Sequence, residues 1–180
     1  NATNIKVIRS PQVAIAGDAG ACVPATLTFK GNLIVPDTSL VTWKWDFGNG
    51  QRSTVINPPA QNYTAAGTFI VKAIATNSSG CDGVATKSIE IYPLPKLITS
   101  GDTTICLGDA ASLHVSGAQS YAWSPSNFLS CTNCANPFAQ ATTSTGYEVT
   151  GTSSHGCISS DSVNVTVKIP FKISVSKPDT

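Results

Sequence analysis

The sequence has no methionine, only two histidines and few charged side chains. Asp, Glu, Lys and Arg make up 12% of the 180 residues, and the formal net charge is +1. Nucleic-acid binding needs clustered Lys and Arg that neutralise phosphates, so this composition argues against it. No apolar run approaches the roughly 18 residues of a membrane-spanning helix, and we expect no membrane insertion. The lack of an initiator methionine and of a signal segment suggests a piece of a longer exported protein.

The two histidines, His114 and His155, are the candidates for a general base beside a serine nucleophile. His114 lies in an alternating stretch that turns it away from the apolar side, and His155 lies in a Ser-Ser-His-Gly turn. The chain has no Gly-x-Ser-x-Gly elbow, and no Asp is placed recognisably to orient either histidine. The sequence therefore predicts no catalytic residues and a protein that is not an enzyme.

The strongest structural signal is the segment from Val41 to Phe47. Apolar and polar residues alternate along it, which is the period of a half-buried strand with three aromatic rings on one face. We expect Trp43 and Trp45 in the core of a β-sandwich rather than on a sugar-binding surface. The rings expected to face outward, where a glycan or a neighbouring domain could pack on them, are Tyr92, Phe128, Phe138 and Phe171.

Two motifs in this half of the chain resemble those of PKD domains. Residues 45–50 are similar to the family's Trp-Asp-Phe-Gly-Asp-Gly, with Asn49 in place of Asp. Residues 63–71 are similar to its Tyr-x-x-x-Gly-x-Tyr-x-Val, with Phe69 in place of the second Tyr. PKD domains are immunoglobulin-like β-sandwiches that occur mostly as extracellular spacers and binding modules, so the resemblance implies that fold here.

The spacing of residues indicates an internal repeat. Ile5 and Cys22 are 17 positions apart, and so are Ile89 and Cys106. We therefore expect an all-β chain of two tandem immunoglobulin-like, PKD-type antiparallel β-sandwiches. The predicted boundaries are residues 10–93 for a PKD domain and 94–168 for a PKD-like domain. Residues 1–9 are assigned to the end of a preceding repeat or a linker, and residues 169–180 to a linker and the start of the next repeat.

The second repeat keeps an aromatic strand, with Tyr121 and Trp123 on one face, but replaces Trp-Asp-Phe by Trp-Ser-Pro. With residues 105–108 and 145–149, it resembles a PKD-like repeat common in very large surface proteins of Bacteroidota. Those proteins include the mobile adhesins of gliding bacteria. The resemblance implies a secreted protein on the outer-membrane exterior that is exported by the type IX route.

Six cysteines in a weakly charged, β-rich chain fit an oxidising compartment. Cys22 and Cys81 bracket the first repeat, and Cys106 and Cys157 bracket the second at equivalent positions. We expect one long-range disulfide in each domain. Other pairings stay open, because an immunoglobulin-like strand order can place these partners at opposite ends of the sandwich.

The remaining two cysteines form the motif Cys131-Thr-Asn-Cys134. Such a motif can be a small structural disulfide, a redox centre or half of a zinc site. A redox centre would follow a βα context, and zinc would need two further ligands of suitable spacing. Neither accompanies the motif, which favours the structural disulfide.

The acidic residues are scattered and supply no Asp-x-Asp-x-Asp run for calcium. We expect no metal site and no cofactor, with an interdomain calcium near Asp102 or Asp109 as the alternative. The tripeptides that begin at Asp102 and Asp161 resemble the Bacteroidota O-glycosylation acceptor. The resemblance implies possible modification of Thr103 and Ser162.

These observations predict a non-enzymatic repeat fragment of a secreted cell-surface adhesin. It would act as a disulfide-locked spacer and as a weak, multivalent adhesion module in gliding motility or surface attachment. The expected partners are surface glycans or solid surfaces, and neighbouring repeats of the same chain. The alternative is a pair of glycan-binding accessory domains in a secreted hydrolase or protease, since PKD domains also accompany such enzymes.

Overall fold

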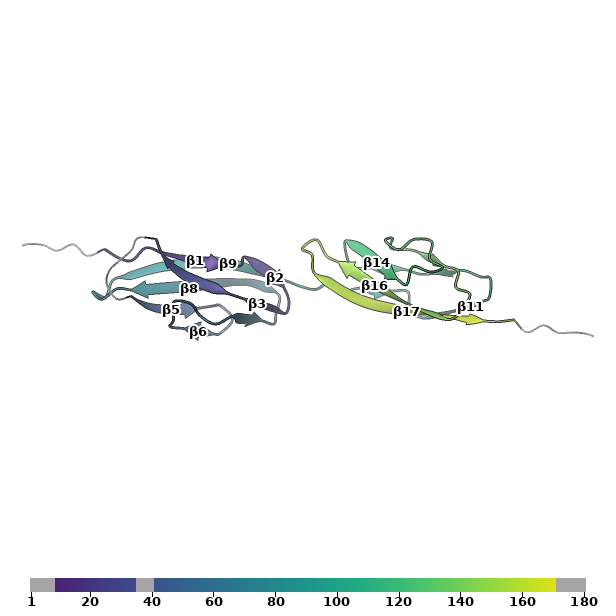
Figure 1. Cartoon of the computed structure of the whole chain (residues 1–180), viewed down its shortest axis with the longest axis horizontal. Coiled ribbons are helices and arrows are strands. Elements are labelled where there is room, and N and C mark those ends of the chain that lie inside the picture. The colour runs from purple at the N-terminus through teal and green to yellow at the C-terminus, as the bar shows by residue number, and fades with distance from the viewer. Residues whose placement is uncertain (1–8, 35–40, 171–180) are drawn as a thin grey trace, which may run out of the picture. The chain divides into compact units, whose positions relative to one another are not determined.

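The computed structural model describes residues 9–34 and 41–170, none of which forms a helix. The chain divides into two compact units, Asn1–Pro93 and Leu94–Thr180. Each is built from strands and turns alone (Figure 1), which confirms the predicted all-β, immunoglobulin-like class. In the described part of the chain, no helix is long and apolar enough to cross a membrane. Residues 1–8 and 171–180, which make up most of the two segments assigned to the neighbouring repeats or linkers, lie outside the described residues.

The first unit has two layers: a five-stranded sheet in one, and two short strand pairs in the other. The sheet has the order β2-β9-β8-β5-β6. Its strands are β2 (Gly20–Cys22), β5 (Thr42–Asp46), β6 (Arg52–Ser53), β8 (Gly67–Thr76) and β9 (Asp82–Tyr92). In the other layer, β1 (Val13–Gly17) pairs with β4 (Phe29–Leu33), and β3 (Ala25–Leu27) pairs with β7 (Gln61–Tyr63).

The aromatic strand β5 lies at the centre of the first core. The side chains of Trp43, Trp45 and Phe47 are 4%, 2% and 0% exposed, which confirms their predicted place in the core. Their rings stack in series, with centroids 5.9 Å apart for the two tryptophans and 5.7 Å for Trp45 and Phe47. Gly31 of β4 lies against the Trp43 ring, where an added Cβ would collide with it. The Trp43 ring therefore fits against the facing layer only because residue 31 has no side chain.

The second unit repeats the arrangement with a four-stranded sheet of order β11-β17-β16-β14. Its strands are β11 (Thr103–Cys106), β14 (Ser120–Ser124), β16 (Thr145–Thr152) and β17 (Ile158–Lys168). In the other layer, β10 (Ile98–Thr99) pairs with β13 (Val115–Ser116), and β12 (Ala111–Ser112) pairs with β15 (Phe138–Ala139). Leu113, Tyr147 and Val149 are fully buried between the two layers.

Both units depart from purely antiparallel pairing at one edge of the main sheet. β2 runs parallel to β9, and β11 runs parallel to β17. The first strand of each unit changes layers: β1 pairs with β4, and the chain then crosses to join β9 as β2. Gly17, with φ 134°, begins this crossing, and glycine tolerates that angle. Because the chain keeps its direction through the crossing, the new edge pair is parallel.

Trp45 of the first core and Trp123 of the second have equivalent places and similar hydrogen bonds. Trp45 donates a hydrogen bond from Nε1 to the carbonyl of Val55 at 2.9 Å. Trp123 donates from Nε1 to the carbonyl of Cys134 at 3.0 Å. Its backbone amide also donates to the carbonyl of Thr132 at 2.7 Å. The Cys131–Cys134 loop of the second unit therefore lies beside β14 as the edge strand β6 lies beside β5 in the first.

Candidate functional site

The open face of the five-stranded sheet carries a groove over β5, β6 and β8. Because Trp45 points into the core, its neighbours along β5 point outward. Two adjoining hollows, of about 210 and 390 Å³, share Lys44, Trp45 and Arg52 in their walls. The first hollow is completed by Asp46, Lys72 and Ile74. The groove is therefore lined by three cationic side chains and one carboxylate.

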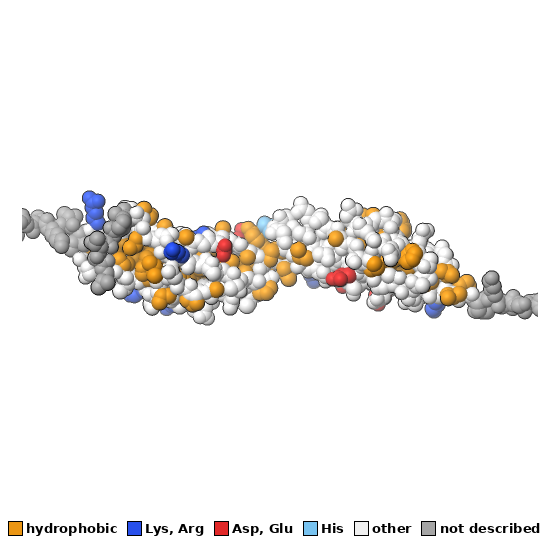
Figure 2. Space-filling model, in the orientation of Figure 1, with side chains coloured by type: hydrophobic (Ala, Val, Ile, Leu, Met, Phe, Trp, Pro, Cys, Tyr) orange, Lys and Arg blue, Asp and Glu red, His pale blue; other side chains and the backbone are white. Residues whose placement is uncertain are grey.

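The carboxylate of Asp46 is already engaged by its neighbours. Its Oδ2 lies 3.4 Å from Nε of Arg52, and its Oδ1 accepts a hydrogen bond from the amide of Gly48 at 3.0 Å. In the strand register Asp46 lies between Arg52 and Lys72. Charged residues make up only 12% of the sequence, and few lie on the face that Figure 2 shows. Three cations in one groove are therefore a local concentration of positive charge.

The overall composition gives no signal for this cluster, because it shows no excess of positive charge. Arg52 and Lys72 are 20 positions apart in the sequence, and they line the same groove only because β6 and β8 both pair with β5. The one local signal was the alternation that turns Lys44 and Asp46 away from the tryptophan face. That signal identifies outward positions, but it does not say which strands lie beside them.

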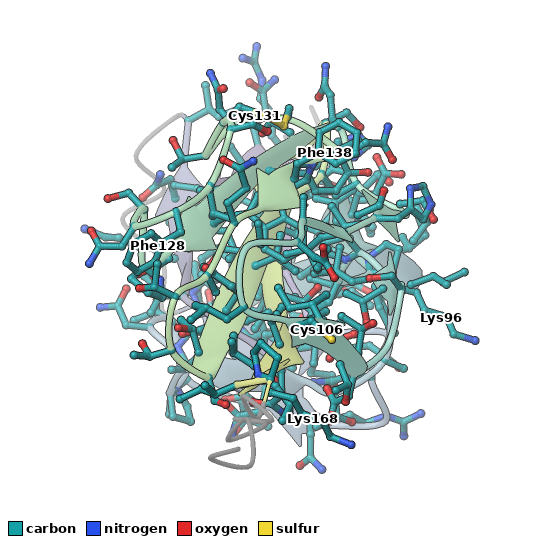
Figure 3. All side chains as sticks on the ribbon, turned by 90° about the vertical axis from the view of Figure 1, so that its right-hand side faces the viewer. Lys96, Cys106, Phe128, Cys131, Phe138 and Lys168 are labelled. Carbon is teal, nitrogen blue, oxygen red and sulfur yellow. A yellow bond between two sulfur atoms is a disulfide. The ribbon has the colours of Figure 1, made fainter. Side chains whose placement is uncertain are left out.

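The outward-facing rings expected from the sequence are only partly exposed. Phe128 and Phe138 are 45% and 56% exposed, whereas Tyr92 is half-buried, and Phe171 lies outside the described residues. The segments of the two phenylalanines are antiparallel: the amide of Gln140 donates to the carbonyl of Phe128 at 2.8 Å. Figure 3 labels both phenylalanines and Cys131 at the end of this unit. Among the described aromatic pairs none joins these two rings, so they do not form one stacked platform.

The predicted long-range disulfides are wrong. Cys81 and Cys106 carry free thiols, whereas Cys22 and Cys157 are disulfide-bonded. The strand register gives the reason. Cys22 lies opposite Tyr92 at the last residue of β9, while Cys81 directly precedes the first residue of β9.

Eleven residues of extended strand separate these two ends, which is roughly 35 Å. A disulfide requires Cα atoms about 4–7 Å apart. The second unit repeats the geometry, because Cys106 lies opposite Lys168 at the end of β17 and Cys157 directly precedes its start. Figure 3 labels Cys106 and Lys168 near each other. Neither predicted pair can form within its unit.

The Cys131–Cys134 motif forms a disulfide with its Cα atoms 6.0 Å apart. This agrees with the structural alternative favoured by the sequence. The loop is anchored to the core, because both Thr132 and Cys134 accept hydrogen bonds from Trp123. Ser130 next to it donates its amide to the carbonyl of Phe138 at 2.9 Å and accepts the Phe138 amide on Oγ at 2.9 Å.

Both histidines are exposed and have polar neighbours: His114 lies between β12 and β13, and His155 lies in the turn before β17. His114 Nδ1 lies 2.5 Å from Oδ1 of Asn136, an amide oxygen rather than a carboxylate. His155 Nδ1 lies 3.3 Å from the hydroxyl of Ser154, the residue next to it. Within the described residues, no group of three or more His, Cys, Asp or Glu side chains could hold a metal ion.

Asp102, which the sequence marked as an alternative calcium ligand, is bonded to Asn164. Its Oδ1 accepts the backbone amide of Asn164 at 2.8 Å, and both of its carboxylate oxygens lie 3.2 Å from Asn164 Nδ2. The backbone hydrogen bond, then the side-chain one, lowers the pKa of Asp102 from its usual 3.8. The amide of Asp109 donates to the carbonyl of Cys106 at 3.0 Å. Asp102 therefore connects β17 to the segment that precedes β11 through these hydrogen bonds.

The two candidate glycosylation residues lie on strands of the second sheet. Ser162 is exposed on β17 and lies opposite Glu148 of β16. Thr103 is half-buried at the first residue of β11, opposite Val165. The side chain of Asp161 accepts a hydrogen bond from Oγ1 of Thr99 at 2.9 Å. Of the two hydroxyl residues, Ser162 is the more accessible.

Comparison with known proteins gives a family match in the first unit. Residues 8–92 match the family model described as PKD domain, which agrees with the resemblance of residues 45–50 and 63–71. Among curated proteins, a microbial collagenase of Vibrio alginolyticus is 30% identical over 117 residues. That alignment covers 64% of this chain and 14% of the collagenase, so the chain spans a small part of that relative.

Two solved PKD structures are also similar to this chain. The PKD1 domain of the Vibrio cholerae metalloprotease PrtV is 23% identical, with a TM-score of 0.40, and the match covers 46% of this chain and 98% of that one. The PKD1 domain of Vibrio anguillarum Epp is 21% identical, with a TM-score of 0.38, covering 47% and 96%. The similarity of the first unit to PKD domains rests on the family match of residues 8–92 rather than on these two structures.

Proposed function

We propose that this chain is a non-catalytic, extracellular spacer with weak adhesive capacity within a longer secreted protein. The family match of residues 8–92 supports an extracellular module. The observation that carries the proposal is the path of the chain through each unit. In both units the chain enters at one end of the sandwich and leaves at the other.

In the first unit, Asn77 Nδ2 donates a hydrogen bond to the carbonyl of Arg9 at 3.1 Å, just before β9 begins. The chain leaves the unit after Tyr92, at the far end of this 11-residue strand. In the second unit, the Ser159 hydroxyl donates to the carbonyl of Pro95 at 2.6 Å, at the start of β17. That strand is also 11 residues long. Tension applied to the chain would therefore act along the whole last strand of each unit.

The parallel edge pairs suit such a load. When the ends are pulled, β2 is drawn toward the entry end and β9 toward the exit end, so the pair is sheared. The amide of Val23 donates to the carbonyl of Tyr92 at 2.9 Å, and the amide of Glu90 donates to the carbonyl of Ala19 at 3.0 Å. Shear loads these hydrogen bonds together, whereas peeling from one end would break them in turn. Each sandwich should hold its length until it unfolds in one step.

Single-molecule force spectroscopy of the whole chain, tethered at its two termini and with its disulfides reduced, tests the spacer. We expect two abrupt unfolding events, one for each unit. Ala21→Pro in β2 should lower the force of one event, because proline cannot donate to the strand ladder. Ala65→Pro, in the exposed loop before β8, is the control and should leave both forces unchanged. Gradual extension without discrete events would overturn the spacer proposal.

The finer part of the proposal is a cell-surface adhesin of the gliding type, exported by the type IX route to the outer-membrane exterior. It rests on the resemblance of the second repeat. The partners would be surface glycans or solid surfaces, and neighbouring repeats of the same chain. Glycosylation of Thr103 and Ser162 belongs to the same proposal. Antibody labelling of intact source cells and intact-mass measurement of the native protein test location and modification, and an intracellular, unmodified protein would refute both.

The second candidate is an accessory segment of a secreted hydrolase or protease, which the similarity to a microbial collagenase favours. An accessory segment should raise the activity of its enzyme on polymeric substrate while leaving activity on small soluble substrate unchanged. Deleting residues 9–170 from the parent protein distinguishes the candidates. A selective loss of activity on polymer favours the accessory role, and a selective loss of cell attachment favours the adhesin.

A further inference from the structure

The groove over β5, β6 and β8 presents its positive charges in a regular pattern. Lys44 lies opposite Ile74, and Lys72 lies opposite Asp46, so the two lysines are diagonal neighbours on adjacent strands. Diagonal neighbours are about 7–8 Å apart. Arg52 lies on the other side of Asp46, about two strand spacings, or roughly 10 Å, from Lys72. Lys72 and Arg52 therefore flank Asp46 across the sheet, and Lys44 lies one outward position back along β5, so the three charges are spread over this face.

The charges of the groove are incompletely balanced. Asp46 is the one carboxylate among the described lining residues, and it is engaged by Arg52 and by the Gly48 amide. Neither Lys44 nor Lys72 forms an ion pair with any residue that the structure describes. Like charges on neighbouring strands repel, so this arrangement costs stability. An anionic partner would relieve that repulsion.

An apolar strip borders the cations. Ile74 of β8 lies opposite Val84 of β9, and Ile70 lies one outward position beyond Lys72. Ile70 and Val84 are 53% and 55% exposed. A partner that fills this face must therefore offer both negative charges and apolar surface. Uronic-acid polymers combine these features, since each ring carries a carboxylate and an apolar C–H face.

The second unit shows that the cluster is not a requirement of the sheet. Its register places Ala122 and Thr150 in the positions of Lys44 and Ile74. Ser124 and Glu148 stand in the positions of Asp46 and Lys72. The same fold thus carries small, hydroxyl and acidic side chains there. The lysines of the first unit are a property of that unit and not of the β-sandwich.

We propose that the groove formed by Lys44, Arg52 and Lys72 binds an acidic polysaccharide. Carboxylates along the polymer pair with the cations, and the apolar faces of the sugar rings cover Ile74 and its neighbours. Each contact is exposed and individually weak, so affinity comes from several contacts along one polymer. The inference rests on the adhesive part of the proposed function and gives that adhesion a ligand class.

The test measures binding of the whole chain to immobilised polygalacturonate by biolayer interferometry at low and at physiological ionic strength. Dextran serves as the neutral polymer, and double-stranded DNA as a polyanion without uronic acids. Lys44→Ala with Lys72→Ala should weaken polygalacturonate binding roughly tenfold. The control, Lys30→Ala with Lys168→Ala, changes the net charge equally at exposed sites away from the groove. It should stay within about twofold of wild type.

Salt-sensitive binding that the Lys44/Lys72 variant loses and the Lys30/Lys168 variant keeps would support the inference. Equal loss in both variants would overturn it, because net charge alone would then explain binding. Tighter binding to DNA would overturn the polysaccharide as the ligand. Binding to dextran but not to polygalacturonate would refute this inference while leaving the adhesive function intact. Binding to none of the polymers would refute this inference, whereas the adhesive function is tested separately by the attachment of cells that lack residues 9–170.

Discussion

Asn77, in the turn between β8 and β9, donates a hydrogen bond from Nδ2 to the carbonyl of Arg9 at 3.1 Å, across 68 sequence positions. Its Oδ1 also accepts the amides of Ser79 at 3.1 Å and Cys81 at 2.9 Å. The residue is only 5% exposed. One buried amide therefore shapes the turn and attaches the entering chain to the first unit.

Asn77→Ala should lower the free energy of unfolding of the first unit by about 2–3 kcal/mol, because buried backbone groups would lose their partners. Asn77→Asp keeps the acceptor and loses the donor, so it should fall between alanine and wild type. Urea denaturation followed by tryptophan fluorescence measures the change. Asn57→Ala, in an exposed loop, is the control and should change stability by less than about 0.5 kcal/mol. A variant at Asn77 as stable as the Asn57 control would contradict the role assigned to the buried amide.

The native protein should have two thiols that react with maleimide, at Cys81 and Cys106. Cys106 is exposed and should react first, whereas Cys81 is half-buried and should react more slowly. Peptide mapping by mass spectrometry after labelling without reductant identifies the labelled cysteines and the order in which they react. A cross-linked peptide that joins Cys22 to Cys81, or Cys106 to Cys157, would contradict the strand register described above.

Stability should fall at alkaline pH because of Tyr63. Burial raises the pKa of Tyr63 from 10.0 to about 12. Its hydroxyl donates to the carbonyl of Phe47 at 3.0 Å, a bond that only the neutral form can make. The unfolded chain loses this proton near pH 10 and the folded chain near pH 12. The contribution of neutral Tyr63 to the free energy of unfolding is therefore complete below pH 10 and is lost as the pH rises to 12.

Tyr63→Phe should reduce this alkaline loss, and it should cost about 1 kcal/mol at neutral pH through the missing hydrogen bond. Urea denaturation across this pH range, with the free thiols alkylated beforehand to prevent disulfide exchange, measures both effects. Wild type and variant curves that stay parallel from neutral to alkaline pH would show that another group causes the loss. Some slope should remain in the variant, because burial also raises the pKa of Tyr147.

Replacing Cys131 and Cys134 together by serine should destabilise the second unit by about 2 kcal/mol, since the disulfide closes a short loop. Trp123 reports on the same loop, because its Nε1 donates to the carbonyl of Cys134. Its fluorescence should therefore change in the native variant as well. Thr132→Ala with Asn133→Ala keeps the disulfide and the backbone acceptors, and should be nearly neutral. Equal stability of the serine variant and wild type would remove the structural role of this disulfide.

Local patterns in the sequence were enough to predict the fold class and much of the core. The alternation from Val41 to Phe47 predicted β5 and the three buried rings of Trp43, Trp45 and Phe47, and residues 45–50 resemble the PKD family, whose model matches residues 8–92. Such features depend on neighbours a few residues apart. The crossing between layers, from the end of β1 at Gly17 to the start of β2 at Gly20, has no such local signature.

The tertiary structure alone decided the cysteine pairing and the charged groove, because both depend on which strands lie side by side. Equal spacing suggested that Cys22 pairs with Cys81, but a long strand with an entry at one end and an exit at the other holds them apart. Pairing of β6 and β8 with β5 brought Arg52 and Lys72 to the two sides of Asp46. The period of side chains along a strand is a local property of the backbone. Strand order and register are set by burial and hydrogen bonding across the whole domain, which no short segment encodes.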